Sequence, residues 1–220
     1  MSLKTVKTRT LEVGYYDHGP SSGWSVLLYH GFPYDIHAYD EVVPKLVSAG
    51  ARVVVPYVRG YGTTRFLSDS TMRSGQQAAL GSDVIELMDA LNIEKAVLGG
   101  FDWGGMSVCV AAALWPERVV GLVSYAGYDI ADLSSYQKPF APSLECKLED
   151  ALASQPKISV PTITLDGRQD PLKPGGTAAH AEHFSGRCER REVDVGHAFP
   201  MEAPDEFTDA ILTIKKWETG

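Results

Sequence analysis

Residues 100–105, Gly-Phe-Asp-Trp-Gly-Gly, are the segment whose residue types and spacing most clearly suggest chemistry. They stand between a short apolar run that predicts a strand, at 96–98, and a small-residue stretch that predicts a buried helix. Glycines on both sides of Asp102 permit a turn so sharp that the aspartate is presented at its tip as a nucleophile. Taken alone, the segment equally fits an aspartate that caps a helix.

Two further polar residues follow predicted strands nearer the C-terminus. Asp170 follows the strand predicted at 162–165, and His197 follows the strand predicted at 192–195. Asp170 could simply form an Asx turn before Pro171, and a single histidine is more often structural than catalytic. However, a nucleophile, an acid and a histidine in this order, each just after a strand, match one known order of a catalytic triad.

The elements that would position these residues alternate along the chain. Strands are predicted at residues 11–16, 26–29, 52–55, 96–98, 119–124, 162–165 and 192–195, and helices at 39–49, 76–91, 104–114 and 207–217. The alternation predicts an α/β fold, a mostly parallel twisted sheet with helices on both faces. Because ligands bind at the carboxyl ends of such strands, the loops that follow the strands are the expected site.

The chain resembles the α/β-hydrolase superfamily, and within it the aspartate-nucleophile branch of epoxide hydrolases and haloalkane dehalogenases. His30-Gly31-Phe32-Pro33 resembles the HGxP motif of epoxide hydrolases, Arg59-Gly60-Tyr61-Gly62 their RGYG segment, and residues 100–105 their GxDWGG turn. The resemblance covers residues from about 11 to 127 and from about 147 to 217. It implies an α/β-hydrolase fold and a cis peptide bond between Phe32 and Pro33.

The resemblance also implies a role for each candidate residue. Asp102 would form an alkyl-enzyme ester, His197 would activate water, and Asp170 would orient His197. The backbone N–H groups of Phe32 and Trp103 would form an oxyanion hole, and neither a cofactor nor a metal is expected. An epoxide-like substrate is favoured, because Phe32 and Trp103 stand where two kinds of dehalogenase commonly carry Asn and Arg.

The connection between the strands at 119–124 and 162–165 is short for this superfamily, whose members usually insert a helical cap there. We predict one core domain over residues 1–220 with a minimal cap-like connection at 128–146, unless the chain lacks a segment. Tyr128 and Tyr136 are the tyrosines of that connection. Either could contact the substrate as an acid, or could merely cover exposed core. So short a connection also predicts a site open to solvent.

Composition limits the remaining classes of function. The net charge of −8 argues against nucleic acid or membrane partners, and 44% hydrophobic residues exclude a disordered chain. The first residues carry no apolar signal core and the three cysteines are far apart, so we expect a cytoplasmic protein whose partner is a small-molecule substrate. The sequence does not indicate the oligomeric state. Carbon–halogen hydrolysis, and ligand binding with little turnover, remain alternatives.

Overall fold

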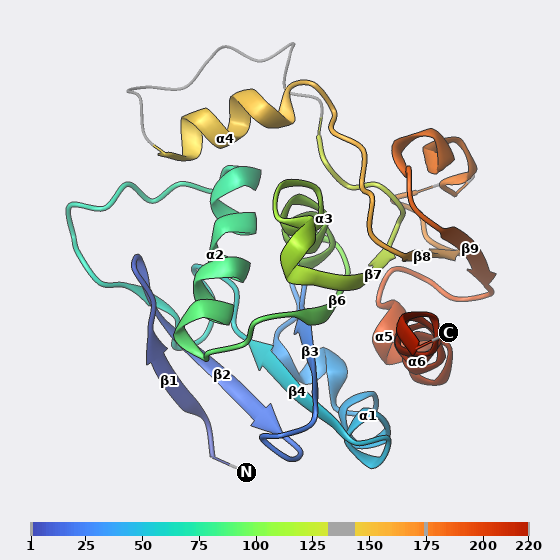
Figure 1. Ribbon diagram of the computed structural model, residues 1–220, viewed down its shortest axis with the longest axis horizontal. Coiled ribbons are helices and arrows are strands. Elements are labelled where there is room, and N and C mark those ends of the chain that lie inside the picture. Colours follow the sequence, from blue (N-terminus) through green and yellow to red (C-terminus); the bar gives the residue numbers. More distant parts are fainter. Residues whose placement is uncertain (1, 132–143, 174–175, 220) are drawn as a thin grey trace.

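The computed structural model describes residues 2–131, 144–173 and 176–219, and its centre is a twisted sheet (Figure 1). Within those residues nine strands follow the order β1-β2-β4-β3-β6-β7-β8-β9, with β5 paired to β2. The pairs that involve β2 are antiparallel and the others are parallel. The strands are β1 (Lys4–Lys7), β2 (Leu11–His18), β3 (Trp24–Tyr29), β4 (Ala51–Pro56), β5 (Arg65–Phe66), β6 (Ala96–Gly100), β7 (Val119–Tyr125), β8 (Thr162–Gly167) and β9 (Cys188–Val193).

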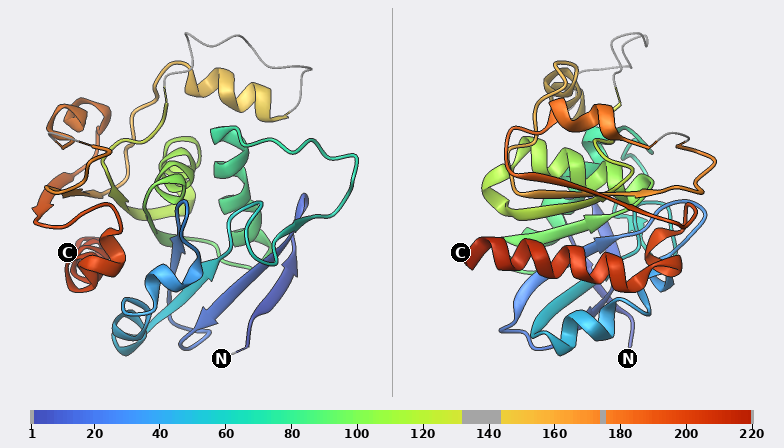
Figure 2. Two further views of the ribbon diagram at one scale, coloured as in Figure 1. Left: turned by 180° about the vertical axis from the view of Figure 1, so that it is seen from behind. Right: turned by 90° about the vertical axis from the view of Figure 1, so that its right-hand side faces the viewer.

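Helices cover both faces of the sheet, as the alternating pattern predicts. Figure 1 shows α2 and α3 on one face and α1 and α6 on the other, and the side view in Figure 2 shows α6 lying along the sheet. The α-helices are α1 (Val43–Ser48), α2 (Gln77–Ala90), α3 (Trp103–Leu114), α4 (Leu144–Leu152), α5 (Phe199–Glu202) and α6 (Pro204–Thr219). Short 3₁₀ helices lie at Ile36–Tyr39, Pro116–Arg118 and Ala178–His183.

Strand β3 shows why the central strands are apolar throughout. Val26 and Leu28 pack in the core beneath α1 and α6, whereas Leu27 and Tyr29 pack in the core beneath α2 and α3. Successive side chains of a strand point to opposite faces, so a strand covered by helices on both faces buries every side chain and is apolar along its length. The same central strands therefore carry the loops of the candidate site on a rigid base.

Two predicted elements differ from the observed ones, and the first observed strand was not predicted. The helix predicted at 39–49 is a 3₁₀ helix at Ile36–Tyr39 followed by the short α1, which begins beside Pro44 because proline is tolerated only in a first helical turn. The last strand is Cys188–Val193 rather than 192–195. Its arginines form ion pairs at the edge of the sheet, so it lacks the apolar pattern of a buried strand. The polar edge strand β1 was not predicted.

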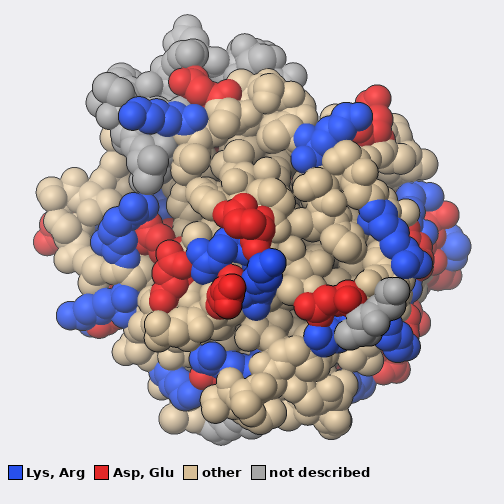
Figure 3. Space-filling view, viewed as in Figure 1, with Lys and Arg blue, Asp and Glu red and all other residues tan. Residues whose placement is uncertain are grey.

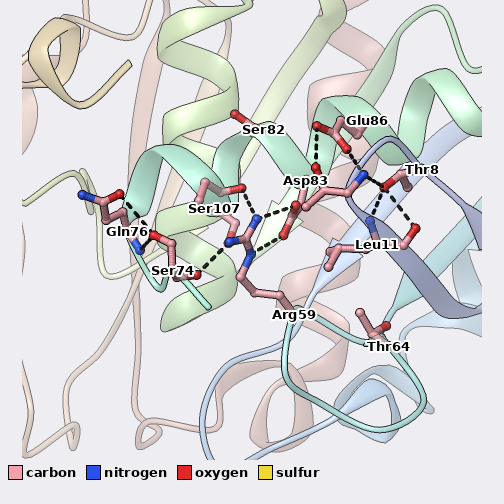
Figure 4. Close-up of polar contacts among 12 residues, drawn as sticks. Thr8, Leu11, Arg59, Thr64, Ser74, Gln76, Ser82, Asp83, Glu86 and Ser107 are labelled. Atoms are coloured by element: carbon pink, nitrogen blue, oxygen red, sulfur yellow. Dashed lines mark hydrogen bonds and ion pairs between the residues drawn. The ribbon is translucent and has the colours of Figure 1, made fainter. Parts of the chain in front are cut away.

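The loop after β4 is fixed by Arg59, the arginine of the RGYG segment. Its guanidinium donates to both carboxylate oxygens of Asp83, at 2.6 and 2.7 Å, and to the carbonyl of Ser74 at 2.7 Å (Figure 4). The Arg59 side chain is 8% exposed. Arg59 therefore anchors its own loop onto α2.

Acidic and basic side chains lie next to one another on the face shown in Figure 3. Among the described residues, no helix combines the length and the apolar character needed to cross a membrane.

Candidate active site

Asp102 stands at a sharp turn between β6 and α3, as predicted. Its backbone has φ 55° and ψ −127°, a conformation that costs energy for a residue with a side chain. A β-carbon on Gly100 would lie 2.5 Å from the carbonyl oxygen of Gly104, and one on Gly104 would lie 2.0 Å from that of Tyr29. Both positions therefore require glycine. The Asp102 side chain makes no hydrogen bond that caps α3, which disfavours the helix-cap interpretation.

The structure brings Asp102, His197 and Asp170 together from three separate strand ends. Nε2 of His197 lies 3.3 Å from Oδ2 of Asp102, and Nδ1 of His197 lies 2.9 Å from Oδ2 of Asp170. Asp170 also forms the alternative turn, because the N–H of Leu172 donates to its Oδ1 at 2.8 Å. A histidine held between two carboxylates in this way has one nitrogen oriented by an acid and the other facing a nucleophile.

Phe32 lies directly over the Asp102 carboxylate. Its backbone N–H donates to Oδ1 of Asp102 at 2.7 Å, and the Phe32–Pro33 peptide bond is cis, as predicted. His30 holds the start of this loop, because its Nε2 accepts from the N–H of Val58 at 3.2 Å and its Nδ1 lies 3.1 Å from the carbonyl of Gly31. Burial lowers the pKa of His30, which agrees with a neutral ring that donates through Nδ1.

Trp103 is the first residue of α3, so its backbone N–H belongs to the helical turn whose amides lack partners within the helix. It directly follows Asp102 in the chain. Its part in an oxyanion hole stays a prediction.

Tyr125, at the end of β7, completes the site and was not predicted from the sequence. Its hydroxyl donates to Oδ2 of Asp170 at 2.6 Å and lies 3.0 Å from the carbonyl of Gly196. Burial raises the pKa of Asp170, but hydrogen bonds from Tyr125, His197 and the Leu172 N–H outweigh burial and hold that pKa below its ordinary value. The Asp170 side chain is 0% exposed, so these hydrogen bonds rather than water keep it ionised beside His197.

Replacing Tyr125 with Phe is expected to lower the free energy of unfolding by about 2 kcal/mol at neutral pH, because a hydrogen bond to a buried charge is lost. The low pKa of Asp170 in the folded state stabilises the protein above the unfolded-state pKa, and this stabilisation is lost as the pH falls through the folded-state pKa. The deficit of Tyr125→Phe should therefore shrink on acidification. Urea unfolding of both proteins at a series of pH values measures this difference in the free energy of unfolding.

Tyr29→Phe is the matched control, since the buried Tyr29 hydroxyl has no hydrogen-bond partner within the described residues. It should cost little at any pH. Equal, pH-independent deficits for the two variants would contradict the coupling of Tyr125 to Asp170.

A cavity of about 180 Å³ adjoins the nucleophile. Asp129, which follows β7, and Lys173, which follows β8, contribute opposite charges to it, and their Oδ1 and Nζ atoms lie 3.5 Å apart. Burial raises the pKa of Asp129, and the positive charge of Lys173 partly offsets that increase. The sequence did not predict either residue as part of the site. The cavity is lined by Asp102, Trp103, Met106, Ala126, Asp129, Leu172, Lys173 and His197.

Tyr128 is not placed to contact a substrate, contrary to one of the two predicted possibilities. It is 5% exposed, its hydroxyl donates to the carbonyl of Pro156 at 2.9 Å, and its ring stacks on His183 at 4.2 Å. It therefore covers core, which was the other possibility. Tyr136 lies outside the described residues, as does most of the connection at 128–146, so the prediction of a solvent-open site stays a prediction.

The described part of the chain contains no cluster of three or more His, Cys, Asp or Glu side chains that could hold an ion.

The chain matches the α/β hydrolase fold family over residues 25–147. It is 36% identical over 97 residues to an epoxide hydrolase of Caballeronia sordidicola, a match that spans 44% of this chain and 29% of that protein. It is 35% identical over 98 residues to epoxide hydrolase B of Mycobacterium tuberculosis, spanning 44% of this chain and 27% of the relative. The matches thus span less than a third of each of these two relatives.

Solved structures show the same architecture over nearly the whole chain. A protein of Klebsiella pneumoniae, provisionally assigned as an epoxide hydrolase, has a TM-score of 0.88 and 32% identity over 97% of both chains. Epoxide hydrolase A of Mycobacterium thermoresistibile has a TM-score of 0.79 over 98% of both chains, and at 19% identity this likeness shows the fold alone.

Proposed function

The chain belongs to the α/β-hydrolase fold family, and on that premise we propose that it hydrolyses epoxides through a covalent ester on Asp102. One observation carries the proposal: Asp102, His197 and Asp170 form a continuous chain of contacts at 3.3 and 2.9 Å, with an amide donor over the Asp102 carboxylate. The similarity to epoxide hydrolases supports this substrate class.

In the first step a carboxylate oxygen of Asp102 attacks a ring carbon of the epoxide. A C–O bond forms between Asp102 and that carbon as the ring C–O bond breaks, and the released oxygen takes up a proton. A carboxylate suits this displacement because it gives an ester, which water can later cleave, whereas a serine would give an ether.

In the second step His197 takes a proton from water while the water oxygen adds to the carbonyl carbon of the ester. The Phe32 N–H, which already donates to Oδ1 of Asp102, would stabilise the negative charge on that oxygen. The intermediate collapses, the diol oxygen receives the proton from His197, and Asp102 is released as a carboxylic acid. Loss of its proton restores the carboxylate and balances the proton taken up in the first step. Asp170 orients His197 through Nδ1 and stabilises its protonated form.

The cavity favours a small reacting group. Its volume of about 180 Å³ is below the usual range of ligand pockets, so the described residues enclose little more than the epoxide and its nearest carbons. Trp103 and Leu172, which line it, are 44% and 65% exposed, which would suit an apolar substituent that extends outward.

A single turnover in heavy-oxygen water tests the mechanism, with enzyme in excess over styrene oxide. The first diol should be mostly unlabelled, because its new oxygen comes from Asp102, and Asp102 should acquire the label. Cleavage at Lys95 and Arg118 releases residues 96–118, in which Glu117 is the sole other acidic residue, so fragmentation can assign the label.

Direct attack by water with Asp102 as a general base would give the reverse pattern, labelled diol and unlabelled Asp102. That outcome would overturn the covalent mechanism. No diol at all would overturn the epoxide assignment, and halide release from alkyl halides would then identify a dehalogenase.

A further inference from the structure

The cavity beside Asp102 contains an ion pair with no part in the two steps above. Lys173 comes from the loop after β8 and Asp129 from the loop after β7, and Nζ lies 3.5 Å from Oδ1. Their side chains are 38% and 19% exposed. Asp129 and Lys173 line the same pocket as the nucleophile, and a partly exposed ion pair contributes little stability by itself, so its position beside Asp102 suggests a role in the reaction.

Opening of the epoxide ring requires a proton donor, and this ion pair can supply one. As the ring C–O bond breaks, negative charge grows on the departing oxygen, and a positioned acid lowers that barrier by roughly 100- to 10,000-fold. Tyr128, one of the two tyrosines considered for this task, points its hydroxyl at Pro156 instead. Among the described residues that line the cavity, the donor must therefore be another side chain.

Three side chains that line the cavity carry N–H groups: Trp103, Lys173 and His197. The indole of Trp103 can donate a hydrogen bond but cannot give up its proton. His197 contacts Asp102 and Asp170 and must accept a proton in the later step. Lys173 remains, because its ammonium has three N–H groups, of which Asp129 need occupy one.

We propose that Lys173, positioned by Asp129, is the acid that protonates the oxygen released from the substrate carbon; this inference rests on the proposed epoxide hydrolysis. The alkoxide takes a proton from Nζ, which leaves a neutral amine and a hydroxyl on the ester. When water later cleaves the ester, Asp102 is released as a carboxylic acid, and its proton returns to the amine. Epoxide and water are consumed, diol is formed, and both side chains are restored.

Asp129 acts through Lys173 and not on the substrate. Its Oδ2 lies against the first turn of α3, where a β-carbon on Gly105 would be 3.6 Å away. The N-terminus of a helix favours a carboxylate there. Asp129 is thus a fixed negative group that holds the ammonium inside the cavity.

The test follows alkylation of Asp102 in a His197→Gln background, where the ester should accumulate. Styrene oxide requires an acid when its ring opens, whereas benzyl bromide releases bromide without a proton. Lys173→Met should slow alkylation by styrene oxide about 100-fold or more and leave alkylation by benzyl bromide unchanged. Lys173→Arg keeps the positive charge but cannot release a proton, so it should stay nearly as slow as Lys173→Met, and Lys157→Met, at an exposed lysine elsewhere, should change neither rate.

Asp129→Asn should slow the styrene oxide reaction less than Lys173→Met does, and should add nothing in the double variant, because both changes act through one group. Unchanged styrene oxide rates in Lys173→Met, or equal slowing with both probes, would overturn the role of Lys173 and leave the proposed function standing. No adduct on residues 96–118 with either probe in the parent would overturn both.

Discussion

His197→Gln should reduce steady-state diol formation by at least about 1,000-fold while Asp102 becomes covalently modified by the substrate. Nε2 of His197 lies 3.3 Å from Oδ2 of Asp102, where it can take a proton from a water that attacks the ester. Glutamine has no comparable basicity, yet attack by the carboxylate does not require a base. Ester formation should therefore continue while its hydrolysis stops, and intact-protein mass spectrometry should show one substrate molecule per chain.

His37→Gln is a matched control, because His37 is 56% exposed and pairs with Asp40 far along the chain from the triad. It should retain full turnover and show no adduct. Unmodified protein together with unchanged turnover in His197→Gln would remove His197 from the mechanism. Loss of turnover without an adduct would instead place His197 in the first step.

The sheet could be predicted from the sequence wherever burial on both faces leaves a clear apolar run. Val26 to Tyr29 and Ala96 to Leu98 are such runs, and both lie in observed strands, β3 and β6. The edge strands do not meet that condition. In β9, Arg190 donates to Asp166 at 2.6 Å, so the strand is satisfied by ion pairs that leave no hydrophobic pattern to detect.

The residues of the candidate site also differ in how clearly the sequence marks them. Glycine spacing marks Asp102, because two positions beside it have no room for a β-carbon. Tyr125 carries no such mark, since a tyrosine in a buried strand is indistinguishable in the sequence from ordinary core. Lys173 and Asp129 are 44 residues apart, and only the parallel order of β7 and β8 brings their loops together.

Removing the Asp102 carboxylate should abolish turnover, and the choice of replacement should expose the backbone strain. Asp102→Ala and Asp102→Gly should each lower diol formation on the order of 100,000-fold or more, since nothing else in the triad can form the ester. Ala keeps a β-carbon at φ 55°, whereas Gly adopts that conformation freely. Relief of roughly 1–3 kcal/mol of strain should exceed the extra entropy that glycine loses on folding.

Asp102→Gly should therefore unfold at a higher denaturant concentration than Asp102→Ala, by about 1 kcal/mol in the free energy of unfolding. Asp209 provides the comparison, because it is exposed and lies beyond the first turn of helix α6, where Ala should exceed Gly in stability by about 1 kcal/mol. The two sites should thus rank Ala and Gly in opposite order. If Ala is more stable than Gly at both sites, the turn at Asp102 relaxes once the carboxylate is removed. The strain would then be imposed by the contacts of Asp102 with Phe32 and His197 rather than by the glycines around it.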